Sequence, residues 1–454
     1  MKTTLELTDI QGDILRAYGN AYDCTAYVFV TFSDAPSGRA SLAQLLPRVT
    51  TATPWASARP STTTNLALTA FGLGALGLPA AALASFAPEF LDGMAVRADH
   101  LGDVGPSGPT HWQVGADERA HALITVNALD TEGMDAELAD LHHVLSTFDV
   151  QVVFQQRANL LHGAREHFGF GDGFSQPAVQ GVRDGRREGG GVPLKGGHWR
   201  PVAPGEFILG YPDEDTRVDR QRRLPAAPTA PLGLNGTYMV WRKLYQDVAL
   251  WRRTLRSAAE HYPDGDEHTL AAKAVGRWPN GTPLATHPDG PDPAYDPHAP
   301  GANDFRYADD ADGFACPLGA HVRRSNPRDA LGFEGKRSFR QRLIRRGMPY
   351  GTPLPEGSYA DDGLDRGLCF VSFQASIVRQ FEGIQVPWLN HGNIFGVGRD
   401  TDFLLGDVTG QGGKLTIQGP VPFFLSPQQA FVRTRGGAYL FVPGLKALAA
   451  LARA

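Results

Sequence analysis

The sequence is poor in cysteine, and it has neither a long apolar run nor an excess of charge of one sign. Its three cysteines, Cys24, Cys316 and Cys369, lie far apart and form no CxxC pair, which argues against a disulfide framework and a zinc site. No stretch approaches the ~18 consecutive apolar residues of a membrane-spanning helix. The 43 basic and 48 acidic residues are mixed along the chain, so it carries no basic field for nucleic acid or an anionic membrane. Small or neutral partners are therefore expected.

The first residues, MKTTLELTDIQGDILRAYG, contain acidic residues and no apolar run. They match neither a secretory signal nor a twin-arginine signal, so the chain as given is predicted to be cytoplasmic. With 454 residues and 42% hydrophobic content the chain can bury a large core. Its length predicts two or three domains, or one unusually large one.

Strand-like and helix-like segments alternate in the first third of the chain. Runs of β-branched and aromatic residues, or apolar alternation, predict strands at residues 25–32, 64–69, 121–126 and 150–154. Helical spacing of apolar residues predicts a helix over residues 135–148, and a shorter one is expected over 41–46. This order favours an α+β fold with helices on one face of an antiparallel sheet.

The same theme returns later in the chain. Strands are predicted at residues 238–244 and 367–374, followed by helices at 247–259 and 375–384, and a late strand pair at 430–434 and 438–442 precedes a closing helix at 445–453. Two halves of similar order suggest a duplicated fold. A Gly, Pro and Arg-rich stretch at 181–204 is the predicted boundary, giving domains at 1–190 and 200–454. The long irregular tract at 279–312 is of the kind that is usually functional or mobile.

The segment HFGFGDGFSQP, residues 167–177, places one acid, Asp172, between glycines at the centre of an aromatic run. A turn needs glycine, but it does not need Phe168, Phe170 and Phe174 packed around a carboxylate. Asp172 is therefore a candidate for a functional acid.

A single histidine is usually a surface or hydrogen-bonded core residue, but His321 has an unusual setting in CPLGAHVRRSNPRD, residues 316–329. The arginines that follow make this an unfavourable place for a charged imidazolium. A neutral imidazole bound to a metal suits it, and the arginines could meet acidic groups of a cofactor. The alternative is a turn with surface arginines.

A second basic cluster, RQRLIRRGMPYG at residues 340–351, precedes a glycine turn. On a strand, Arg340, Arg342 and Arg346 would share one face and Arg345 the other, so Arg345 is expected to point inward. A buried arginine needs an anionic or strongly polar partner, and Asp172 is a candidate. A solvated edge strand protected by charge is the alternative.

Six segments in consistent order resemble the dye-decolourising peroxidases, in their large, soluble bacterial branch. Residues Gly169 to Gly173 resemble the GxxDG signature of the family, GAHVRRSNPR its proximal-histidine segment, and RRGMPYG its distal-arginine segment. DIQGDILRAYG near the start, VGRWPNGTPL at 275–284 and GLCFVSFQASIVRQFEGIQ at 367–385 also resemble this branch. The segments span nearly the whole chain.

The resemblance implies a haem b peroxidase built from two ferredoxin-like α+β halves, with antiparallel sheets, peripheral helices and the haem held mainly by the C-terminal half. It implies hydrogen peroxide as oxidant and bulky aromatic donors such as dyes and phenols as reductants, with Mn²⁺ left open as a further reductant.

The resemblance also implies roles for single residues. His321 would be the proximal iron ligand, Asp172 the distal acid that moves a proton within peroxide, and Arg345 the arginine that stabilises cleavage of its O–O bond. Arg323 and Arg328 are weaker candidates for contacts to the haem propionates, and Glu382 is a candidate hydrogen-bond partner of the proximal imidazole. Gly171, directly before Asp172, is expected to leave the distal side open.

Two rival interpretations remain at this point. A haem-binding or haem-delivery protein could hold the cofactor with the same ligands and without turnover, although simple carriage requires no distal acid and arginine. A non-haem α+β fold with surface arginines is the other, and an absorption spectrum separates them.

Overall fold

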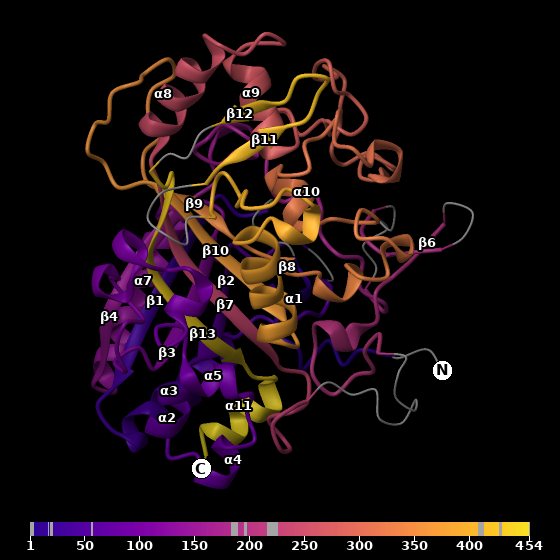
Figure 1. The fold of residues 1–454 in the computed structure, drawn as a ribbon. Coiled ribbons are helices and arrows are strands. Elements are labelled where there is room, and N and C mark those ends of the chain that lie inside the picture. The colour runs from indigo at the N-terminus through magenta and orange to yellow at the C-terminus, as the bar shows by residue number, and fades with distance from the viewer. Residues whose placement is uncertain are drawn as a thin grey trace.

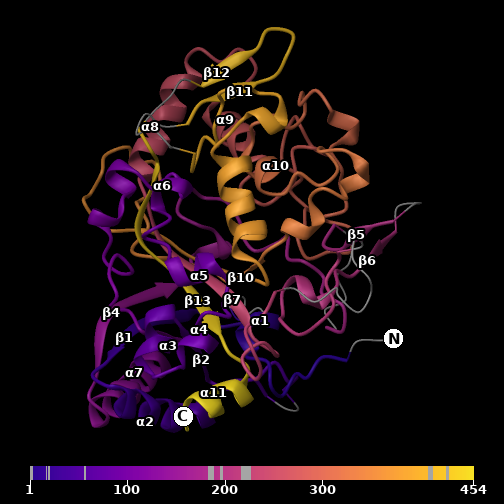
Figure 2. The ribbon, with the colours of Figure 1, turned by 60° about the horizontal axis from the view of Figure 1, so that its bottom comes forward.

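The computed structural model describes residues 4–453 except residues 17, 19–20, 56–57, 183–188, 195–197, 216–225, 407–412 and 426–428. Most of the secondary structure belongs to one nine-stranded antiparallel sheet and to the helices around it, seen from two sides in Figures 1 and 2. Within the described ranges, no helix is both long and apolar enough to cross a membrane.

The first half of the sheet has the strand order β4-β1-β3-β2, with antiparallel pairing throughout. Helices α2 and α7 connect β1 to β2 and β3 to β4, which is the ferredoxin-like arrangement, and short helices fill the β2–β3 connection. The bounds are β1 (Cys24–Phe32), α2 (Ala35–Leu45), β2 (Thr62–Leu68), α3 (Ala70–Ala75), α4 (Ala80–Leu83), α5 (Pro88–Asp92), α6 (Ala98–Leu101), β3 (Ala122–Ala128), α7 (Thr131–Thr147) and β4 (Val150–Asn159).

The second half repeats this order as β13-β7-β10-β8, with β9 pairing on the other part of β10. By chain position the order is again fourth, first, third, second, as in the first half. The bounds are β7 (Thr237–Gln246), α8 (Val248–Ala259), α9 (Glu267–Val275), α10 (His321–Ser325), β8 (Ile344–Arg345), β9 (Met348–Tyr350), β10 (Gly367–Gln374), β11 (Leu415–Ile417), β12 (Phe423–Leu425), β13 (Val432–Val442) and α11 (Leu445–Leu451). Two small strands, β5 (Val192–Pro193) and β6 (Trp199–Arg200), pair separately.

The two halves meet where β2 lies beside β13, with Leu68 opposite Phe441. The N-terminal segment around α1 (Gly12–Leu15) strengthens this junction. The buried amide of Gln11 donates to the carbonyl of Leu66 at 2.8 Å and to that of Pro443 at 3.0 Å. The predicted duplication of an antiparallel α+β unit is therefore confirmed, but both units share one sheet. The domain limits at 190 and 200 stay a prediction, and residues 183–188 and 195–197 of that stretch lie outside the described residues.

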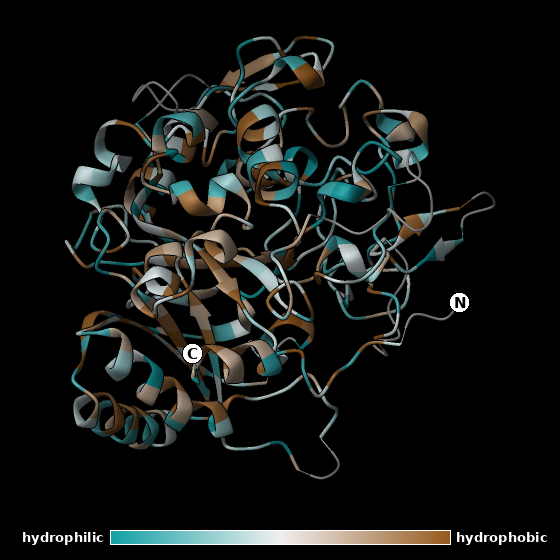
Figure 3. Cartoon of the chain, turned by 90° about the horizontal axis from the view of Figure 1, so that it is seen from below, coloured by the Kyte–Doolittle hydropathy of each residue, from teal (hydrophilic) through white to brown (hydrophobic). Residues whose placement is uncertain are grey.

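The sheet curls into a barrel whose interior is aromatic. Trp241 on β7 contacts Phe29 on β1 and Phe154 on β4, with ring centroids 4.8 and 6.0 Å apart, although these strands lie far apart in the strand order. The opposite face packs against α2, α7 and α11 in a second apolar cluster. Both faces of the inner strands are thus buried, which is why β1 and β3 are almost continuously apolar. Figure 3 shows apolar, brown segments in strands near the centre of the molecule.

Aspartates begin four of the described helices. The side chains of Asp34, Asp130, Asp247 and Asp266 accept hydrogen bonds from backbone N–H groups in the first turns of α2, α7, α8 and α9. Helices α2 and α7 therefore begin several residues before the starts that apolar spacing predicts, because their first turns are held by a cap and carry few core residues.

Two predicted elements differ in the structure. The late strand pair is one strand, β13, because Gly436 and Gly437 lie within it at a bulge. A Cβ atom on Gly437 would come 2.4 Å from the sulfur of Met94, so this glycine permits close packing instead of a turn. The helix predicted at 375–384 is present as a helical run over 377–389, which is mostly π-helical and comprises η11 (Ile377–Glu382) and η12 (Gln385–Leu389).

Candidate active site

A pocket lies on the face of the second half-sheet that is turned away from the barrel interior. Alternate residues of a strand share a face, and on β7 Leu244 and Gln246 line the pocket whereas Trp241 lies in the barrel. The side chains of Leu368 and Phe370 on β10 continue this apolar floor. Other walls come from α9, α10, η11, η12 and the segment 166–175.

The loop that carries Asp172 is fixed by hydrogen bonds to the side chain of Glu166. Its carboxylate accepts the backbone N–H groups of Phe168 at 2.9 Å and Phe170 at 3.0 Å, and the side-chain amide of Gln246 on β7 at 2.6 Å. The next turn depends on Gly173, whose φ of 87° lies in the left-handed region. Glu166 and Gly173 together place Asp172 at the edge of the pocket.

Asp172 and Arg345 form an ion pair at the pocket wall. Nη1 of Arg345 donates to Oδ1 of Asp172 at 3.0 Å. The side chain of Arg345 is 35% exposed and that of Asp172 is 46% exposed. Burial by itself raises the pKa of Asp172, but the charge of Arg345, the N–H of Gly173 and the hydrogen bond from Arg345 together lower that pKa below its ordinary value. Asp172 is therefore a carboxylate at neutral and mildly acidic pH.

The backbone around Arg345 is fixed on both sides. Its N–H donates to Oε1 of Gln176 at 3.0 Å, and it lies opposite Ser372 where β8 pairs with β10. The side chain of Arg346 donates to the carbonyl of Arg345 at 2.9 Å and to that of Asp13 in the N-terminal segment at 3.0 Å. These bonds fix the backbone of Arg345 and leave its guanidinium available to groups in the pocket.

His321 is the first residue of α10 and lines the same pocket. Its Nδ1 lies 2.9 Å from Oδ2 of Asp402, whose side chain is fully buried and also accepts the N–H groups of Leu404 and Leu405. Burial raises the pKa of Asp402, but the charge and hydrogen bond of His321 outweigh this effect and lower it overall. A carboxylate on Nδ1 leaves Nε2 of His321 as the ring nitrogen available to a metal.

Comparison with known proteins agrees with this geometry. The family model for the DyP dimeric alpha+beta barrel domain matches residues 9–160. The chain is 30% identical over 494 residues to a dye-decolorizing peroxidase of Mycena epipterygia, covering 99% of this chain and 88% of the relative. It is likewise 30% identical over 476 residues to the multifunctional dye peroxidase DyP2 of an Amycolatopsis species, covering 98% and 96%. The chain belongs to the dye-decolorizing peroxidase family.

A solved dye-decolorizing peroxidase in complex with 2,6-dimethoxyphenol has the same fold, with a TM-score of 0.84 and 28% identity, over 99% of this chain and all of that one. Dye-decolorizing peroxidases are haem-dependent oxidoreductases, and family membership extends that class to this chain. Among the residues that the structure describes, no three His, Cys, Asp or Glu side chains group as a site for a bare metal ion.

The sequence predicts Glu382 as the hydrogen-bond partner of the His321 imidazole, but in the structure that partner is Asp402. Glu382 accepts two hydrogen bonds from Arg97, at 2.6 and 2.7 Å, and one from the hydroxyl of Tyr439 at 2.8 Å. These bonds tie η11 to the first half and to β13. Glu382 therefore serves the junction of the two halves and has no hydrogen bond to His321.

Arg323 and Arg328 do not line this pocket, and their assignment to the haem propionates stays a prediction. Arg323 donates to Asp310 at 2.9 Å and to the carbonyl of Cys316 at 2.7 Å. Arg328 donates to the carbonyls of Asn303 and Phe305 and stacks 3.7 Å from the ring centroid of Phe305. Arg323 thus holds loops of the second half together. Arg328 does so as well, but its buried Nε and Nη2 have no protein partner within the described residues, and it lines a small cavity together with Arg342.

Arg342 lines the pocket together with Arg345, although strand parity predicts opposite faces. The parity rule fails because only Ile344 and Arg345 form strand β8, and residues Phe339–Gln341 form a 3₁₀ turn, η10. Nη1 of Arg342 reaches the carbonyl of Gly189 at 3.3 Å, and its buried Nη2 has no protein partner within the described part of the chain. Burial and the charges of neighbouring arginines lower the pKa of Arg342 to about 9.

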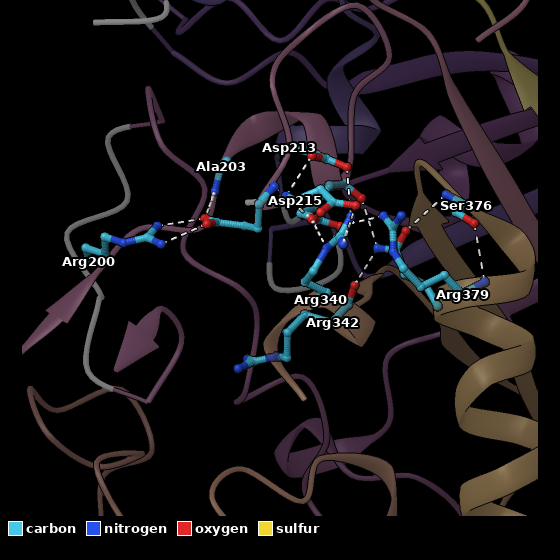
Figure 4. Close-up of polar contacts among 11 residues, drawn as sticks. Arg200, Ala203, Asp213, Asp215, Arg340, Arg342, Ser376 and Arg379 are labelled. Atoms are coloured by element: carbon cyan, nitrogen blue, oxygen red, sulfur yellow. Dashed lines mark hydrogen bonds and ion pairs between the residues drawn. The ribbon is translucent and has the colours of Figure 1, made fainter. Parts of the chain in front are cut away.

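A buried ionic cluster anchors the segment that carries Arg342 (Figure 4). The fully buried carboxylate of Glu206 accepts from Arg340 at 2.8 Å and from Arg379 on η11 at 2.5 Å. The side-chain amide of Gln380 donates to the carbonyl of Glu206 at 2.9 Å and to that of Arg342 at 2.8 Å. Figure 4 shows the Arg342 side chain extending away from this cluster. Its backbone is thus fixed, while its Nη2 can donate to an anion.

Gly171 does not leave the distal side open as predicted. A Cβ atom on this residue would lie 2.5 and 2.6 Å from two ring atoms of Phe174, which occupies the space that a side chain at 171 would fill. The glycine is therefore matched to the aromatic residue three positions later, and this contact could not be read from the motif alone.

Proposed function

We propose that this protein is a haem b peroxidase that uses hydrogen peroxide to oxidise bulky aromatic donors such as dyes and phenols. One observation carries the proposal: an Asp172–Arg345 pair and a His321–Asp402 pair line the same pocket. The first pair suits acid–base chemistry on peroxide, and the second suits axial ligation of iron. The phenol in the solved relative's complex belongs to the proposed donor class.

The residues present fit a haem. His321 would hold the iron through Nε2, with Asp402 orienting the ring and raising its basicity. Arg342 carries a buried N–H group without a protein partner, and the acidic side groups of haem b are the kind of anion that would satisfy it. Both residues belong to the C-terminal half, which supports the proposal that this half holds most of the haem.

Haem, when bound, supplies the iron that accepts oxidising equivalents from peroxide and passes them to the donor. In the proposed reaction, the carboxylate of Asp172 takes the proton from one oxygen of hydrogen peroxide. It returns that proton to the other oxygen, which leaves as water. The guanidinium of Arg345 stabilises the negative charge that develops on the departing oxygen. The phenylalanines around Asp172 limit access of bulk water to this exchange.

A haem carrier without turnover is the second candidate. Carriage needs the axial ligand and groups for the acidic side chains of haem, but it gives no reason for an acid and an arginine paired at 3.0 Å in the pocket. The geometry therefore favours the peroxidase.

The purified protein is expected to show a Soret band and to oxidise phenols and anthraquinone dyes when peroxide is added. A steady-state screen with 2,6-dimethoxyphenol, an anthraquinone dye and Mn²⁺ checks this, and the Mn²⁺ arm decides whether that ion is also a reductant. A Soret band with no oxidation of any donor would identify a haem carrier. Absence of any haem band after reconstitution would reject both proposals.

Arg345→Leu is expected to keep its haem but to react with peroxide on the order of 10²-fold more slowly, because loss of one preorganised charged donor costs about this much. The rate at which peroxide changes the Soret band in stopped-flow mixing measures the defect. Arg342→Leu is the matched control from the same segment: it should weaken haem retention and leave the peroxide reaction of the loaded protein near the parental rate. The reverse pattern would exchange the roles of the two arginines.

A further inference from the structure

The ring of Phe174 sits in a slot made by two glycines. A Cβ atom on Gly171 would lie 2.5 Å from its nearest ring atom, and one on Gly281 would lie 2.7 Å from the ring. Gly281 also has a φ of 96°, in the region that favours glycine, and belongs to the irregular tract at 279–312. Side chains at either position would displace the ring from the slot.

The same tract holds the backbone beside the ring. Asn303 donates its side-chain amide to the carbonyl of Phe174 at 2.9 Å, and its own oxygen accepts from the buried Arg277 at 2.6 Å. Gly171 donates its N–H to the carbonyl of Pro279 at 3.0 Å. The backbone on which the ring turns is therefore fixed, whereas the ring itself is only half-buried.

Phe174 lies between the pocket and an exposed histidine. On one side it lines the pocket next to Asp172. On the other side its edge meets His298, an exposed residue, with ring centroids 6.0 Å apart and planes at 84°. Rotation of this one side chain out of its slot would widen the opening beside Asp172 and Arg345, whose side chains are 46% and 35% exposed.

We propose that Phe174 is the gate of the distal pocket and sets the size of the molecule that reaches Asp172. This inference rests on the proposed function. With the ring of Phe174 in its slot, small molecules such as hydrogen peroxide enter the pocket more readily than large ones. Organic hydroperoxides, whose O–O group carries a bulky carbon substituent, would require the ring to move before they enter. The gate selects the oxidant, whereas the aromatic donor needs no passage through this opening.

Phe168 provides a matched control for the gate. It is the same residue type in the same loop and lines the same pocket, but its ring packs inward on Trp251 of α8, with centroids 5.1 Å apart. Truncation of Phe168 removes the same number of atoms and loosens the same loop without opening the wall at His298.

The test compares association of imidazole, a five-membered ring, with association of cyanide, a two-atom ligand, in the ferric holoprotein by stopped-flow absorbance. Phe174→Ala should speed imidazole about tenfold or more and cyanide no more than about twofold, because a gate that must open first slows association in proportion to its closed population. Phe174→Leu should fall between parent and alanine. Phe168→Ala should leave the imidazole-to-cyanide ratio within about twofold of the parent. The variants are expected to follow the same order in the rate of reaction with cumene hydroperoxide divided by the rate with hydrogen peroxide.

An unchanged ratio in both Phe174 variants overturns the gate, and so does an equal change in Phe168→Ala, which would mean that loosening the loop suffices. Should Phe174→Ala fail to fold, the leucine variant decides alone. These outcomes differ from failure of the proposed function, in which the parent protein itself shows no haem band or no reaction with peroxide.

Discussion

His321→Ala is expected to purify with little haem, or with an altered Soret band if a small molecule takes the axial position. The reason is that His321 is the pocket residue whose Nδ1 is held by a buried carboxylate, so that Nε2 alone is left to bind iron. Haem content per chain and the low-temperature spin-resonance spectrum of the ferric protein measure the loss.

Asp402→Asn serves as the control for His321→Ala. It should retain haem but raise the reduction potential of the iron, because an amide cannot give the imidazole the electron density that a carboxylate gives. Glu382→Gln should leave the potential unchanged, since Glu382 bonds to Arg97 and Tyr439. Full haem and an unchanged spectrum in His321→Ala would move the ligand elsewhere. His167 and His162 would be the next candidates, although Nε2 of His167 already lies 2.8 Å from the carbonyl of Tyr350.

The residues that short motifs identify were brought together by the fold. Asp172, Arg345 and His321 each stand in a local sequence that is unusual by itself, with glycines around an acid or arginines around a histidine. Their local signals were sufficient to nominate them. The fold adds that they share a pocket, which depends on the pairing of β8 with β10 and on the loop held by Glu166.

Residues that act through a distant partner escaped sequence reasoning. Asp402 lies 81 residues after His321 and in no recognisable motif, so only the fold joins them. Glu382 is a reasonable candidate by composition, but its partner Arg97 directly precedes α6, in the other half of the chain. Arg342 escaped for a different reason: the parity rule assumes a continuous strand, and the chain changes from a 3₁₀ turn to a strand within three residues.

The pKa of Asp172 decides where on the pH scale the enzyme should work. Aromatic neighbours and Arg345 act on it in opposite directions, and sequence alone could not rank them. In the structure the arginine and the hydrogen bonds outweigh burial, so the pKa of Asp172 lies below its ordinary value. The carboxylate needed to accept a proton is therefore present down to that lowered pKa and is lost only below it. Because the proton that Asp172 returns comes from peroxide itself, the rate of this transfer should stay level above that pKa.

The reaction with peroxide is accordingly expected to keep its full rate from neutral pH into the acid range and to fall only near the lowered pKa of Asp172. Asp172→Asn should slow the reaction with peroxide by roughly 10²- to 10⁴-fold while leaving the haem bound, because an amide of the same shape cannot exchange the proton. Asp172→His is the sharper variant. Histidine has a reference pKa of ~6.5 against ~3.9 for aspartate, so the acid limb of the pH–rate profile should move upward if residue 172 is the proton carrier. Stopped-flow mixing with peroxide across the acid range measures both. If Asp172→Asn reacts at the parental rate throughout, Asp172 only shapes the turn, and the proton must travel by way of Arg345 and water.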